Sequence, residues 1–105
     1  MGASTYLDIV EAENARDAFI KATEDARHLE GHAGYTGTIA EKYDQVIIDP
    51  EKDGKDVSGW TRGDFADYAQ NLINEGDGRI EDKWGPSGCI DTRDGAFILF
   101  GWASS

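Results

Sequence analysis

Residues 31–42 bring together side chains that can bind a ligand. The polar ones are His32, Tyr35, Thr36, Thr38 and Glu41, and glycines lie between them. Glycine lets a backbone come close to a ligand, while imidazole, hydroxyl and carboxylate groups supply donors and acceptors. This loop is therefore a candidate site for a small ligand. A phosphate-binding loop places its glycines before a helix. These glycines follow a predicted helix, which disfavours a nucleotide and favours a helix end that leads into a strand.

Metal binding would need more ligands than the sequence places together. His28 and His32 are four residues apart, as on one face of a helix, but Gly31 between them is a typical helix end. Residues 49–56 space carboxylates like part of a calcium loop. Trp60, however, stands where the closing bidentate Glu belongs. We therefore expect no metal ion and no cofactor.

Catalysis would depend on Cys89, the only cysteine in the sequence. With His32 as its base, this thiol would make a nucleophile. A cysteine at the start of a predicted strand is usually buried and inert, however. Glu41 and Asp91 offer an acid–base pair, but any acidic protein offers such pairs. The question of enzymatic activity stays open, and the residues favour a protein without it.

The charge of the chain is its clearest global property. The sequence has 21 acidic and 10 basic residues, which gives a formal net charge of −11. Such a field repels nucleic acids and anionic membranes and attracts basic proteins. We expect no direct contact with nucleic acid or with a membrane, and a basic protein surface as the partner. Solubility or adaptation to salt is the alternative explanation.

Two predicted helices carry carboxylates on their polar faces, which together can imitate a row of phosphates. These partner-binding candidates are Asp17, Glu24, Asp25, Asp64, Asp67 and Glu75. Trp84 is the candidate for an apolar anchor. Gly85 and Pro86 follow it and favour a loop at the surface, and tryptophan is enriched among the residues that dominate binding energy.

A small set of predicted elements must position these side chains. Residues 5–10 are largely β-branched and aromatic, which predicts a strand. Residues 15–30 carry an apolar stripe at helical spacing, with Asn14 as N-cap and Gly31 at the end. Thr61 and Asp64 predict the capped start of a second helix, which ends at Gly76.

The remaining segments predict strands. Residues 31–42 and 44–49 are expected to form a hairpin that turns near residues 42–44, and residues 79–84 can form a short extra strand. Residues 89–92 and 96–102 flank a strong hairpin signal, and residues 97–100 are apolar on both faces, which places that strand centrally. The order β-α-β-β-α-β-β predicts one α+β domain over residues 1–105. We expect an antiparallel sheet of four to five strands with two helices on one face.

Three stretches resemble a motif set in short uncharacterised proteins of phages and bacteria. They are residues 31–42 (GHAGYTGTIAEK), 83–89 (KWGPSGC) and 100–104 (FGWAS). The resemblance implies an origin in a mobile element and supplies no activity.

Charge and resemblance together lead to one functional hypothesis. We expect an acidic partner-binding protein that inhibits a host nucleic-acid-binding defence protein, of anti-CRISPR or anti-restriction type, by mimicking DNA. The alternatives are a ligand-binding, metal-binding or enzymatic module built on residues 31–42, and an acidic structural or accessory protein. One cysteine cannot form an internal disulfide, and residues 1–5 lack the features of a signal peptide. We therefore expect a cytoplasmic protein, in the host cytoplasm if a phage encodes it, and the oligomeric state stays open.

Overall fold

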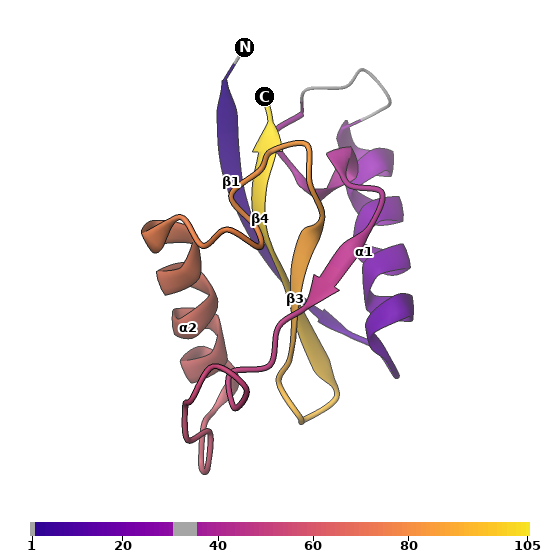
Figure 1. The fold of residues 1–105 in the computed structure, drawn as a ribbon. Coiled ribbons are helices and arrows are strands. Elements are labelled where there is room, and N and C mark those ends of the chain that lie inside the picture. Colours follow the sequence, from indigo (N-terminus) through magenta and orange to yellow (C-terminus); the bar gives the residue numbers. More distant parts are fainter. Residues whose placement is uncertain (1, 31–35) are drawn as a thin grey trace.

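The computed structural model describes residues 2–30 and 36–105. Within them the chain forms two α-helices and a four-stranded sheet (Figure 1), so the α+β class is confirmed. In chain order the elements are β1 (Ala3–Glu11), α1 (Ala15–Glu30), a 3-10 helix (Ile39–Glu41), β2 (Gln45–Ile47), α2 (Arg62–Glu75), β3 (Ser87–Asp91) and β4 (Ala96–Ser104). No helix of the described residues is long and apolar enough to cross a bilayer.

The sheet is mixed rather than wholly antiparallel. Its strand order is β1-β4-β3-β2, in which β4 pairs antiparallel with β1 and β3, while β2 runs parallel to β3. The connection explains the parallel pair, because α2 lies between β2 and β3 in the chain and a crossover helix joins parallel strands. The predicted hairpin of residues 31–42 with residues 44–49 is wrong for the described residues, because residues 39–41 form a 3-10 helix and β2 pairs with β3. Residues 31–35 lie outside the described residues.

Turns replace two predicted strands. The side chain of Thr38 accepts a hydrogen bond from the Ala40 N–H at 3.2 Å and caps the 3-10 helix where a strand end was predicted. Residues 79–84 form turns instead of the short extra strand. Ile80 within them is 1% exposed and packs into the core, which explains its apolar character.

Both predicted helices are confirmed, together with the predicted caps at the start of α1 and at both ends of α2. Gly31, predicted to end α1, lies outside the described residues. At the start of α1, Asn14 Oδ1 accepts a hydrogen bond from the Asp17 N–H at 2.9 Å. At the start of α2, Thr61 and Asp64 form a reciprocal capping box, and Gly76 ends the helix in the left-handed conformation at φ 68°. These contacts satisfy backbone groups that a helix end leaves without intrahelical partners.

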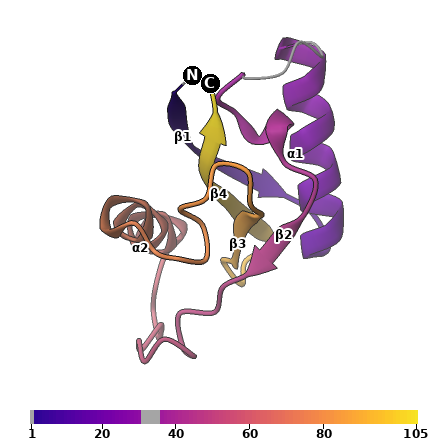
Figure 2. The same ribbon diagram turned by 45° about the horizontal axis from the view of Figure 1, so that its top comes forward.

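The two helices pack on opposite faces of the sheet (Figure 1 and Figure 2). The central strand β4 shows why. Phe97 and Leu99 belong to the buried cluster under α1, whereas Ile98 and Phe100 belong to the cluster under α2. The expectation of both helices on one face is wrong, because a strand that is apolar on both faces needs a cover on each side.

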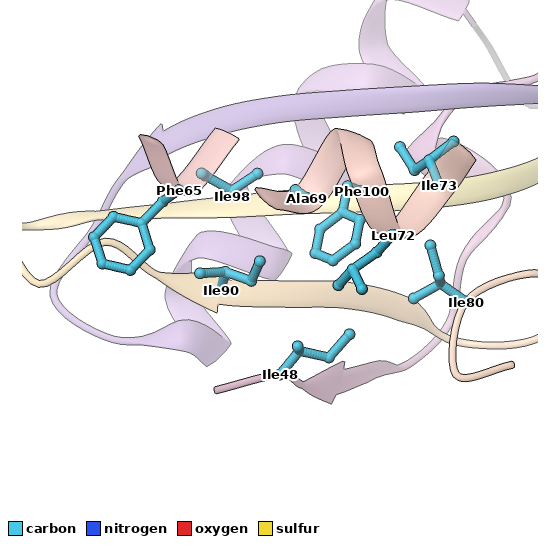
Figure 3. Packing of buried hydrophobic residues seen from close by; sticks show 9 residues of the cluster. All are labelled: Ile48, Phe65, Ala69, Leu72, Ile73, Ile80, Ile90, Ile98 and Phe100. Atoms are coloured by element: carbon cyan, nitrogen blue, oxygen red, sulfur yellow. The ribbon is translucent and has the colours of Figure 1, made fainter. Parts of the chain in front are cut away.

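The larger buried cluster lies between α2 and the sheet (Figure 3). Its members are Ile48, Phe65, Ala69, Leu72, Ile73, Ile80, Ile90, Ile98 and Phe100. Gly88 of β3 allows this packing, because a Cβ atom there would lie 2.7 Å from Phe100 Cζ and 2.9 Å from Ile80 Cγ2. The ring of Phe100 therefore approaches the sheet at a position that only glycine leaves open.

Candidate functional site

Trp84 lies on the loop between α2 and β3, which is orange in Figure 1. It is 62% exposed, so its predicted place at the surface is confirmed. The Trp84 N–H donates to Asp82 Oδ1 at 2.8 Å, and the Gly85 N–H donates to the Asp82 carbonyl at 2.9 Å. Residues 82–85 thus form a tight turn, called the Trp84 turn below. The Lys83 ammonium lies 5.5 Å from the centroid of the Trp84 ring, within cation–π range.

A buried lysine fixes the backbone of this turn. Lys42 is 1% exposed, although lysine is almost never buried without partners. Its ammonium donates to the carbonyl oxygens of Asp82, Lys83 and Gly85 at 3.3, 3.2 and 2.8 Å. An ammonium has three N–H donors, so the Trp84 turn can satisfy all of them. Sequence reasoning placed Lys42 in a hairpin turn and missed this role.

The hydrogen bonds of Lys42 must offset the free-energy cost of burying its ammonium. Burial lowers the pKa of the ammonium, and the Asp82 carboxylate partly opposes that shift. Removing an ammonium from water costs several kcal/mol, while hydrogen bonds to a charged group contribute about 1.5–3 kcal/mol each. The three hydrogen bonds offset the cost of burying the ammonium only while the three carbonyl acceptors stay in place. The turn that carries Trp84 is therefore held in one backbone conformation.

A second exposed aromatic residue lies on the segment that carries Lys42. Tyr43 is 88% exposed, and the Arg27 guanidinium of α1 lies 5.7 Å from the centroid of its ring. Arg27 also donates to the Lys42 carbonyl at 3.1 Å. On the other side, the Ser87 N–H donates to the Asp44 carbonyl at 2.9 Å. Helix α1 and strand β3 thus position the segment from which Lys42 reaches the Trp84 turn.

The carboxylates predicted to bind a partner are exposed, but the two helices that carry them lie on opposite sides of the sheet (Figure 2). On α1 they are Asp17, Glu24 and Asp25, and on α2 they are Asp64, Asp67 and Glu75. Because the sheet separates the two helices, the six carboxylates do not form one row. Asp64 also accepts hydrogen bonds from the N–H and the hydroxyl of Thr61, so it is a helix cap as well as a surface charge.

Arginine neutralises part of the acidic surface, and it does so away from α1. The ion pairs join Arg62 to Glu11 and Asp94, Arg79 to Asp53 and Asp77, and Arg93 to Asp49 and Glu51. Hydrogen bonds from Arg79 lower the pKa of both of its carboxylate partners. Among the described side chains, Asp17, Glu24 and Asp25 of α1 take part in none of these ion pairs. The same holds for Asp64, Asp67 and Glu75 of α2, so these ion pairs do not distinguish the two helices.

Three of the alternative ligand-binding residues form a network with one another. The Thr36 hydroxyl lies 2.8 Å from Glu41 Oε2 and 2.8 Å from Thr38 Oγ1. The Thr36 N–H also donates to Glu41 Oε2, at 3.2 Å. These groups stabilise the turn that leads into the 3-10 helix. His32 and Tyr35, the other two residues of that hypothesis, lie outside the described residues.

The groups considered for catalysis and for calcium binding have other surroundings. Cys89 is 0% exposed, and burial, reinforced by the charge of Asp91, raises the pKa of its thiol to about 12. The thiol is thus protonated at neutral pH and lies in the core. Asp53 of the calcium-like segment pairs with Arg79. In residues 2–30 and 36–105, no three His, Cys, Asp or Glu side chains are grouped to hold a metal ion.

Comparisons with protein-family models, with curated proteins and with solved structures found no match. What the chain does must therefore be inferred from its own side chains. Among them the Trp84 turn is the most informative, because a buried cation holds a large apolar side chain in solvent.

Proposed function

We propose that this chain is an acidic partner-binding protein that uses Trp84 to anchor a basic protein. The observation that carries the proposal is the difference in solvent exposure between Trp84 and Lys42, whose ammonium binds the turn that carries Trp84. Trp84 is 62% exposed, and Lys42, which holds its turn, is 1% exposed. A fold that buries an ammonium to fix a turn, and then leaves a tryptophan of that turn in water, gains from the arrangement when a partner covers the ring.

The energy available from Trp84 is large enough to anchor an interface. A tryptophan buries about 150–250 Å² when it is fully covered, so covering the exposed part of Trp84 removes roughly 100–150 Å² from water. At about 25 cal/mol per Å² this contributes about 3 kcal/mol. Because Lys42 already holds the turn, binding loses little further conformational entropy there. Residues with these properties are typical of the centre of an interface.

The charge around the turn supports a basic partner. Asp44, Glu81 and Asp82 are exposed on the segments that meet at Lys42, and the whole chain carries a net charge of −11. Lys83 and Arg27 are local exceptions, and each lies near an aromatic ring. An acidic rim speeds association with a basic surface and makes binding depend on salt.

The specific form of the proposal is an inhibitor of a host nucleic-acid-binding protein, of anti-CRISPR or anti-restriction type. It is supported by the negative charge, and it also draws on the resemblance expected from the sequence to short uncharacterised proteins of phages and bacteria. Because α1 and α2 lie on opposite faces, one partner groove would meet the carboxylates of only one helix. Such a groove would meet the exposed carboxylates Asp17, Glu24 and Asp25 on α1, or Asp64, Asp67 and Glu75 on α2.

Affinity capture tests the proposal. The chain is immobilised and exposed to lysate of the host cell at low salt, and retained proteins are eluted with a salt gradient. Trp84→Ala is compared with Ile47→Ala, which removes another exposed apolar side chain, 59% exposed, from the edge strand β2. We expect basic proteins that elute with salt from the parent chain and from Ile47→Ala, and at least tenfold less of them from Trp84→Ala.

The same experiment separates the forms of the proposal. Duplex DNA added to the captured complex should release a partner whose nucleic-acid site is occupied, whereas a partner held elsewhere stays bound. If no basic protein is retained at low salt, or if Trp84→Ala retains as much as the parent chain, the proposal is wrong.

A further inference from the structure

The outer edge of β1 offers hydrogen-bonding groups that the sheet does not use. β1 spans Ala3–Glu11 and lies at one end of the sheet, paired only with β4 (Figure 1). The opposite edge strand, β2, has only the residues Gln45–Ile47. Edge strands present rows of N–H and C=O groups to which another strand can add, and β1 is the longer of the two edges.

The hydrogen bonds at the two ends of β1 show which residues face outward. Gly2 and Ser105 exchange both backbone hydrogen bonds, at 3.1 and 3.2 Å, and the Ala12 N–H donates to the Gly95 carbonyl at 3.1 Å. Bonded and non-bonded pairs alternate along an antiparallel ladder, so the even-numbered residues of β1 bond to β4. The odd-numbered residues turn their N–H and C=O groups outward. They are Ala3, Thr5, Leu7, Ile9 and Glu11.

Most of these outward groups are open to a new strand. Within the described part of the chain, the one contact to them is from the Lys21 ammonium, which lies 3.4 Å from the Glu11 carbonyl oxygen. The amides of Thr5, Leu7 and Ile9 therefore form a continuous outward row in the middle of the strand.

A groove with two carboxylates runs beside this edge. It has a volume of about 370 Å³ and lies between β1, the later turns of α1 and Thr38. Among its lining residues are Asp8 and Ile9 of β1, Asp25 and Leu29 of α1, and Thr38. Leu29 is 82% exposed, so an apolar side chain of α1 lies beside the carboxylates. Asp8 is exposed, and partial desolvation of its carboxylate raises its pKa.

The sign of the charge selects the occupant. A second copy would bring another chain of net charge −11, and another Asp8, against this edge, and like charges across paired strands are destabilising. A segment with Lys or Arg at alternate positions would instead direct its cations to one face. On that face the cations meet Asp8 and Asp25. The alternate side chains of the same segment lie on the opposite face of the sheet, beside Ile9.

We propose that the outer edge of β1 is the docking site for an extended, basic segment of a partner protein, which adds to the sheet as a further strand. Its cationic side chains lie over the groove at Asp8 and Asp25. The inference rests on the proposed function only for the basic character of the partner, and it concerns a different surface from the Trp84 turn.

Amide hydrogen exchange of the full chain tests the docking mode, because the even-numbered and odd-numbered amides of β1 should respond differently to an added strand. The probe is a nine-residue peptide of alternating lysine and valine with blocked ends, and the control is the same peptide with glutamate for lysine. In the free chain the Tyr6 and Asp8 amides should exchange slowly and those of Thr5, Leu7 and Ile9 rapidly. The lysine peptide should slow the exchange of the Thr5, Leu7 and Ile9 amides at least tenfold, and the glutamate peptide should leave their exchange unchanged.

Charge variants test the groove. The double variant Asp8→Asn with Asp25→Asn should weaken the lysine peptide by roughly 2- to 30-fold, the range for two exposed charge pairs. The matched variant Asp67→Asn with Glu75→Gln makes the same change of charge on α2, across the sheet, and should change the affinity less than 2-fold. If both double variants lose the same affinity for the lysine peptide, the peptide is attracted by the net charge alone, which would contradict a site at Asp8 and Asp25.

The remaining outcomes also decide the question. Unchanged exchange of the odd-numbered amides with the lysine peptide would overturn the docking site. Protection that grows with protein concentration in the absence of peptide would assign the edge to a second copy and would also overturn it. Trp84→Ala should bind the peptide as the parent chain does. If the lysine peptide does not bind but capture of a basic protein still depends on Trp84, the docking site on β1 is wrong and the proposed function is unaffected.

Discussion

Replacing Lys42 with methionine should loosen the turn that presents Trp84. Methionine keeps most of the buried volume but removes the ammonium. The Asp82 carbonyl keeps its bond from the Gly85 N–H, whereas the carbonyls of Lys83 and Gly85 lose the donor that Lys42 supplies. Each buried carbonyl without a partner costs about 1–3 kcal/mol, and removing the ammonium recovers its own burial cost. Because water can reach a loosened turn, we expect a net loss of about 2 kcal/mol.

Two measurements check this prediction. Urea unfolding followed by circular dichroism gives the free energy of unfolding, which should fall by about 2 kcal/mol in Lys42→Met and by less than about 0.5 kcal/mol in Lys55→Met. Lys55 is exposed, so this control changes the same residue type without a burial effect. Amide exchange of residues 83–85 should accelerate in Lys42→Met and stay unchanged in Lys55→Met.

Two results for Lys42→Met would contradict this role of the ammonium. If Lys42→Met unfolds at the same urea concentration as the parent chain and the exchange of residues 83–85 is unchanged, the ammonium does not hold the turn. A more stable Lys42→Met with a protected turn would show that burial of the charge outweighs its hydrogen bonds, which is the opposite of the balance derived above.

Three further changes follow from the packing and the titration of buried groups. Gly88→Ala should lower the free energy of unfolding by about 1–3 kcal/mol, because its Cβ meets Phe100, whereas Gly78→Ala, with open space around it, should change little in the same urea titration. Cys89→Ala should flatten the alkaline loss of stability. The folded thiol has a pKa of about 12 against an ordinary value of 9.0, so its contribution is complete below pH 9 and is lost as the pH rises toward 12. That loss reaches about 1.4 kcal/mol per pH unit, and equal slopes for variant and parent would contradict it. Asp8→Asn should raise the melting temperature at pH 7, because burial raises the pKa of Asp8 and so disfavours its charged form. The gain should shrink as the pH falls toward 3.8, and a lower melting temperature at pH 7 would refute the assignment.

Local signals predicted the elements whose determinants are close in sequence. Asn14 and Thr61 each bind a backbone N–H three residues away at a helix start, and those helices were predicted at the correct places. The hairpin of β3 and β4 is another case, because Gly95 with φ 91° supplies its turn locally. The exposure of Trp84 belongs to this class too, since the Gly and Pro after it are local features.

Features that depend on distant residues were not predicted. Lys42 and its acceptors are 40 to 43 residues apart in the chain, and no nearby pattern distinguishes it from a surface lysine. The parallel pairing of β2 likewise depends on the path of the chain through α2. The opposite placement of the helices was readable in principle, because residues 97–100 are apolar on both faces and such a strand needs cover on both sides.

The most direct test of the central claim is an amide exchange map of the chain with a captured basic partner, read against the free chain. If Trp84 anchors the partner, protection should concentrate on residues 82–85 and on the neighbouring residues 43 and 44, and rising salt should weaken the complex. A map in which residues 82–85 exchange as in the free chain while another surface becomes protected would contradict the claim.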